Sequence, residues 1–89
     1  MPKLEFSERI ATDLAFVTSQ NFEARIMENL DDIERFAEFG SALVPVPIKE
    51  SFGNGVRKVS VNPFDLAYTY YPDCDLVCVE ALVHQRSAK

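Results

Sequence analysis

The 89-residue sequence predicts an α+β fold: a short N-terminal strand, then an antiparallel helical hairpin packed on a mostly antiparallel four-stranded sheet, in the order β-α-α-β-β-β. Two observations predict this class. Apolar residues recur at helical spacing in the first half of the chain, and β-branched and aromatic runs separated by turn residues fill the second half. Because 47% of the residues are hydrophobic, one core can form, and we expect residues 1–89 to be a single domain.

The first half is expected to hold one strand and two helices. Residues 3–6 alternate polar and apolar side chains, which predicts a short strand, and Ser7 is a favourable N-cap for the helix that follows. The apolar face of that helix consists of Ile10, Leu14 and Val17. A second helix is predicted from apolar residues at the same spacing, namely Phe22, Ile26, Leu30, Ile33 and Ala37. Gly40 is predicted to end it as the C′ residue.

The second half is expected to be sheet. Pro45 and Pro47 predict extended backbone rather than helix, and residues 52–55 have the composition of a turn. Strands are predicted at residues 56–61, 65–71 and 76–83, with turns at 62–64 and 72–75. The last strand is apolar on both faces, which predicts a central position. The sheet face that the helices do not cover is expected to be open.

The charge of the chain is concentrated in its first half. Residues 1–39 carry nine acidic and four basic side chains, which gives −5, whereas residues 40–89 carry five of each. A net acidic chain disfavours sequence-independent binding to nucleic acid phosphates, although a local group of cations can still bind them. The acidic helical face is either ordinary solvated surface or a surface for a basic partner segment, and composition does not distinguish the two.

Metal, cofactor and membrane functions are not expected. The two Cys and one His are too few for a zinc site or a disulfide framework, and the chain has no glycine-rich phosphate loop. No apolar run is long enough to span a membrane, and the N-terminus lacks the apolar region of a signal peptide. We therefore expect a cytoplasmic protein with no cofactor.

One set of residues has the chemistry for phosphoryl transfer on RNA, which requires an acid or base and cations around the phosphate. His84 is the candidate acid or base, and Arg57 and Arg86, with Lys58, are the candidate cations. Bases could stack on exposed tyrosines, here Tyr68, Tyr70 and Tyr71. In the alternative interpretation, the cations lie on a solvated strand edge and the tyrosines belong to the core.

Four short motifs in the order of the predicted elements resemble the RelE/ParE superfamily of type II toxin–antitoxin toxins, also known for plasmid stabilisation. They are residues 4–9, 55–59, 62–68 and 82–86, and the similarity covers nearly the whole chain. The resemblance implies a RelE/ParE-like fold and a bacterial toxin that inhibits growth. It also implies neutralisation by a cognate antitoxin in a hetero-oligomer. RelE-like members cleave mRNA on the ribosome, and ParE-like members poison DNA gyrase.

Carried over residue by residue, the resemblance implies a catalytic set of Arg57, His84 and Arg86, with Lys58 and Tyr68 in contact with the target. Asp65 departs from it, because RelE-like nucleases have an Arg there, and no Tyr follows Arg86. These departures favour a toxin, bound by an antitoxin, that acts on replication through gyrase or on translation. The alternatives are a ribosome-dependent mRNA endonuclease and a non-toxic interaction domain that retains the fold.

Overall fold

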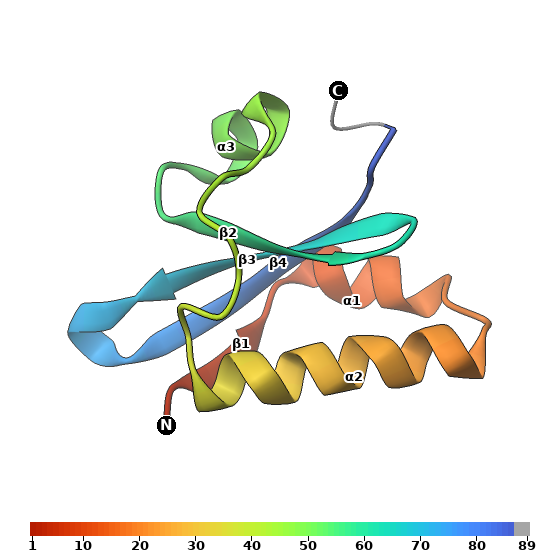
Figure 1. Ribbon diagram of the computed structural model, residues 1–89, viewed down its shortest axis with the longest axis horizontal. Helices are drawn as coiled ribbons and strands as arrows, with labels where there is room; N and C mark the ends of the chain where they lie inside the picture. Colours follow the sequence, from red (N-terminus) through yellow and green to blue (C-terminus); the bar gives the residue numbers. More distant parts are fainter. Residues whose placement is uncertain (87–89) are drawn as a thin grey trace.

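The structure is a computed structural model that describes residues 1–86, and its elements follow the expected order with one added helix (Figure 1). In chain order the elements are β1 (Lys3–Phe6), α1 (Glu8–Ala15), α2 (Gln20–Arg35), α3 (Val46–Phe52), β2 (Val56–Val61), β3 (Phe64–Tyr71), the short 3₁₀ helix η1 (Pro72–Cys74) and β4 (Leu76–His84). The predicted α+β class is confirmed.

The strands form one sheet in the order β1-β4-β3-β2. β1 runs parallel to β4, and the other two neighbouring pairs are antiparallel. β4 is therefore central, as its two apolar faces predict, and β1 and β2 are the edges. The strand limits lie close to the expected ones, although β3 begins at Phe64 instead of Asp65 and β4 ends at His84 instead of Val83.

Helices α1 and α2 lie on one face of the sheet and enclose the main core (Figure 1). The predicted N-cap is confirmed, because the Ile10 N–H donates a 3.0 Å hydrogen bond to the Ser7 Oγ. Helical periodicity also identified the buried faces correctly. The buried residues of this core are Ile10, Ile26, Leu30, Ile33, Ala37, Val61, Leu66, Tyr68, Val77, Val79 and Leu82.

The prediction of extended backbone around Pro45 and Pro47 is wrong, because α3 begins there. Pro45 is the N-cap of α3, and Pro47 lies in its first turn. Backbone N–H groups in the first turn have no partner within a helix, so a proline at these positions removes no helical hydrogen bond. A helix can therefore start at prolines that would disrupt its interior.

No helix in residues 1–86 is both long and apolar enough to cross a membrane.

Helix α3 covers part of the sheet face that was expected to be open (Figure 1). Its buried residue Ile48 packs with Val56 of β2 and Ala67 of β3 in a second, smaller core. Phe52 of α3 also meets α1, because the Arg9 guanidinium lies 5.5 Å from the centre of its ring. The sheet is thus sandwiched between the α1–α2 pair and one short helix.

Helix α2 ends before the predicted Gly40 cap. The chain leaves the helix at Phe36 in an extended conformation. Gly40 instead packs closely on Tyr68, where a Cβ atom would lie 2.7 Å from the tyrosine hydroxyl oxygen. That hydroxyl accepts a hydrogen bond from the Gly40 N–H and donates one to the Ala37 carbonyl, each at 2.7 Å. A buried side chain therefore attaches the loop after α2 to the sheet.

Candidate functional site

The Arg57 guanidinium on β2 is engaged within the fold. Its Nη1 donates to the Gly40 carbonyl oxygen at 2.8 Å, and its Nη2 lies 3.4 Å from the Glu38 carboxylate. The Arg57 side chain is only 24% exposed. Its positive charge is thus paired with Glu38 instead of being directed at an external phosphate.

Lys58 is also paired internally. Its Nζ lies 3.6 Å from Oδ1 of Asp65, a carboxylate that is almost fully buried. The same oxygen accepts hydrogen bonds from Ser60 Oγ at 3.4 Å and Gln85 Nε2 at 3.2 Å. Asp65 therefore neutralises the lysine that was expected to contact a nucleic acid, and it also holds the residue that follows β4.

The ring of Tyr68 is fully buried, so it cannot stack on a base in this conformation. Burial is also the main cause that raises the pKa of its hydroxyl above the ordinary value. Tyr71, at the end of the same strand, is 46% exposed. The Tyr68 contact expected from the sequence is replaced by a structural role in the core.

His84 and Arg86 lie together at the end of β4, away from Arg57. The Arg86 N–H donates to His84 Nδ1 at 3.2 Å, and the imidazole packs edge-on against Phe64 with ring centres 5.2 Å apart. Arg57 pairs across the sheet with Tyr68, whose partner on β4 is Val79. Since strands rise about 3.4 Å per residue, His84 lies on the order of 15 Å farther along the sheet. The proposed catalytic residues therefore do not converge.

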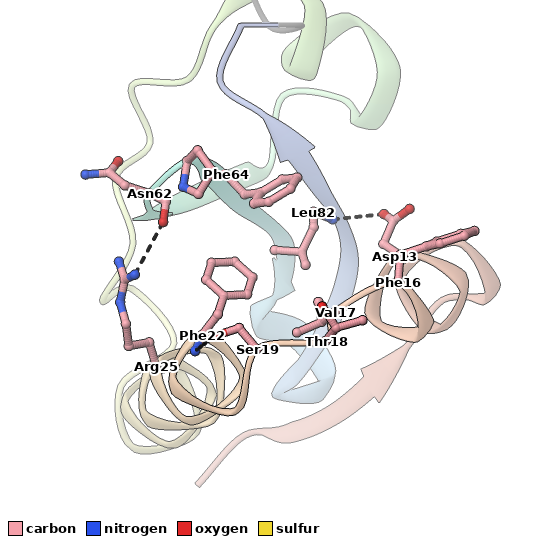
Figure 2. Close-up of a pocket in the computed structure, with 11 residues that line it drawn as sticks. Asp13, Phe16, Val17, Thr18, Ser19, Phe22, Arg25, Asn62, Phe64 and Leu82 are labelled. Carbon is pink, nitrogen blue, oxygen red and sulfur yellow. Dashed lines mark hydrogen bonds between the residues drawn. The ribbon is translucent and has the colours of Figure 1, made fainter.

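A groove with a volume of about 560 Å³ lies at the turn between α1 and α2 (Figure 2). It is bounded by the end of α1, the start of α2, the β2–β3 turn and the second half of β4. Its lining residues are Asp13, Phe16, Val17, Thr18, Ser19, Phe22, Arg25, Asn62, Pro63, Phe64 and Leu82. This volume is typical of binding pockets and grooves.

The interior of this groove is apolar and aromatic. Phe22 of α2 and Phe64 of β3 approach each other with ring centres 5.5 Å apart, and Leu82 of β4 lies beside them (Figure 2). Phe16, at the C-terminal end of α1, is 80% exposed. Exposed apolar surface around a concave site is typical of places where another molecule binds.

Two charged residues lie on opposite sides of the groove (Figure 2). Asp13 has internal partners: it accepts a hydrogen bond from the Leu82 N–H at 3.0 Å and lies 3.8 Å from the Arg9 guanidinium. Arg25 donates to the Asn62 carbonyl at 3.3 Å and lies 5.8 Å from the centre of the Phe22 ring. Within residues 1–86 no carboxylate is paired with Arg25. The groove thus presents one cation beside an apolar surface.

Sequence analysis did not identify this groove. Its residues come from separate segments that the fold brings together, so no spacing in the chain marks them. One local signal was present, because Phe16 lies outside the apolar face formed by Ile10, Leu14 and Val17. A large aromatic residue off the buried face of a helix points to exposed apolar surface.

Cys78 lies on the sheet face opposite the groove, and its thiol is a weaker acid than that of an ordinary cysteine. Burial, and then the carboxylates of Glu80 and Glu5, raise its pKa to about 11, and its thiol donates to Glu80 Oε1 at 3.5 Å. Since the thiolate is the reactive form, we expect alkylation of Cys78 at pH 8 to be about a hundredfold slower in the folded chain than in urea. Mass spectrometry of a Cys74→Ser variant treated with iodoacetamide measures this ratio. Equal rates in the two states would contradict it.

No cluster of at least three His, Cys, Asp or Glu side chains suited to a metal is present in residues 1–86. The two cysteines are free thiols. The apolar groove is thus the feature best suited to binding.

Comparison with known proteins gave no match to a family model, a curated protein or a solved structure. The resemblance to the RelE/ParE superfamily therefore rests on the short motifs and the order of elements. What the chain binds must be inferred from its own surface.

Proposed function

We propose that this chain is the toxin of a type II toxin–antitoxin module and that its antitoxin binds in the groove at the α1–α2 turn. The observation that carries the proposal is the groove itself, an apolar surface with one cation, Arg25, that lacks a carboxylate partner in residues 1–86. The bound segment would insert apolar side chains between Phe22 and Phe64 and place a carboxylate near Arg25. The motifs that resemble the RelE/ParE superfamily support the assignment to a toxin.

The target is proposed to be a protein of the replication machinery, with DNA gyrase tested first. Engagement of Arg57 by Glu38 and of Lys58 by Asp65 argues against RNA cleavage, because both cations are neutralised. The distance between Arg57 and His84 along the sheet argues against it as well. A toxin that acts by binding a protein needs no such convergence.

The first test is induced expression of the chain alone in a bacterial host, with growth, DNA synthesis and protein synthesis followed together. We expect DNA synthesis to stop before protein synthesis, and purified chain to inhibit supercoiling by gyrase. If protein synthesis stopped first and Arg86→Ala abolished cleavage of ribosome-bound mRNA, the endonuclease alternative would replace this proposal. Normal growth with folded chain present would instead favour the interaction domain.

The second test locates the antitoxin. Relief of growth arrest by co-expression of the protein encoded beside this chain identifies the partner, and titration calorimetry measures its affinity. We expect Phe16→Asp and Arg25→Glu each to weaken binding by about tenfold or more, since each removes an exposed contact of the groove. Both side chains are exposed, so folding should be retained.

Matched controls lie outside the groove. Phe36→Asp changes a phenylalanine that is 61% exposed at the other end of α2, and Arg35→Glu reverses an exposed arginine on the same helix. Neither should change the affinity by more than about twofold. Equal losses in the groove variants and the controls would show that the antitoxin binds elsewhere.

A further inference from the structure

β1 is an exposed edge of the sheet. It pairs with β4 alone, and Lys3, Glu5 and Phe6 are exposed. The Lys3 N–H donates to the Asp75 carbonyl and the Ser7 N–H to the Val79 carbonyl, both on the β4 side. Because these directions alternate along a strand, the N–H and C=O of Leu4 point away from β4. The same holds for Phe6.

We propose that two copies of this chain associate through β1, with the two strands antiparallel around a two-fold axis at Leu4. In this register the two Leu4 residues exchange backbone hydrogen bonds. The sheet would then continue across both copies.

The charges on β1 select this register. With Leu4 on the axis, Lys3 of each copy lies directly opposite Glu5 of the other, on the same face of the sheet, where cross-strand pairs of opposite charge are stabilising. An axis at Glu5 would place the two Glu5 carboxylates opposite each other, which is destabilising. Neither Lys3 nor Glu5 has an ion-pair partner within residues 1–86.

The same charges favour a second copy over an unrelated strand. Charged residues on an edge strand generally discourage pairing with other strands. Lys3 and Glu5 are two residues apart, so an antiparallel copy of the same strand satisfies both charges at once. This inference does not depend on the proposed toxin function, because it uses only the edge strand and its sequence.

Charge exchange tests the proposal. Sedimentation velocity over a wide range of concentration should show a monomer–dimer equilibrium for the unmodified chain. Lys3→Glu and Glu5→Lys each convert both cross-strand pairs to like charge, so each should weaken dimerisation by about tenfold or more. The double variant restores both opposite pairs and should recover dimerisation. A mixture of the two single variants should form a mixed dimer.

Glu28→Lys is the matched control, because it makes the same change of charge at an exposed position on α2 and should leave dimerisation unchanged. Circular dichroism checks that every variant is folded. A chain that stays monomeric at all concentrations overturns the proposal and leaves the β1 edge to a strand of another protein. Failure of the double variant to recover dimerisation overturns the two-fold register at Leu4.

Discussion

Replacement of Tyr68 by Phe is expected to lower the free energy of unfolding by about 3 kcal/mol. The substitution keeps the ring in the core but removes the hydroxyl that bonds to the Ala37 carbonyl and the Gly40 N–H. Both groups lie in buried residues, so each would lose its partner without gaining water. Urea unfolding followed by circular dichroism measures the change.

Tyr70→Phe provides the matched control on the same strand. Its hydroxyl donates to the Asp75 carboxylate at 3.1 Å, in an exposed hydrogen bond that water can replace. We expect a change of about 0.5 kcal/mol or less. Similar losses of stability in the two variants would show that the Tyr68 hydroxyl does not fix the loop after α2. An unchanged m-value would confirm that both variants unfold in the same way.

The parts of the fold that could be predicted are those that short segments determine. The Ser7 cap and the apolar faces of α1 and α2 depend on residues within a few positions of one another. The runs that became β2, β3 and β4 are equally local. The start of α3 was missed because the rule that proline disrupts a helix applies to the interior and not to the first turn, where Pro47 lies.

The candidate site was less predictable, because it depends on contacts between distant segments. Sequence reasoning selected Arg57 and Lys58 for their charge, but the carboxylates that pair with them, Glu38 and Asp65, are set by the fold. The edge position of β1 was likewise open, since a helical connection permits either an edge or a central strand. Local sequence patterns identify charged residues. Whether those residues are free to bind a ligand depends on how the folded chain packs around them.

Replacement of Asp65 by Leu is expected to lower the free energy of unfolding by about 3 kcal/mol. The carboxylate is buried and accepts hydrogen bonds from Ser60 Oγ and Gln85 Nε2. The Lys58 ammonium lies 3.6 Å from it. Removing it leaves the Lys58 ammonium, 24% exposed, without its counter-charge and the Ser60 hydroxyl without its carboxylate acceptor. Gln85 Nε2 loses one of its acceptors but keeps Asn62 Oδ1 at 2.7 Å. Thermal and urea unfolding measure the loss, which should be accompanied by greater protease sensitivity after His84.

A double-mutant cycle separates the energy of the Lys58–Asp65 ion pair from the effect of changing the shapes of the two side chains. Lys58→Met alone leaves the buried Asp65 carboxylate without its cation and should cost about 2 kcal/mol, whereas Lys58→Met with Asp65→Leu should cost clearly less than the sum of the single changes. Additive losses would mean that the two charges are not coupled. If coupling is found, the carboxylate that stabilises the end of β4 is also the group that withdraws Lys58 from external phosphates. Asp65 would then both stabilise the fold and keep the Lys58 charge from external ligands.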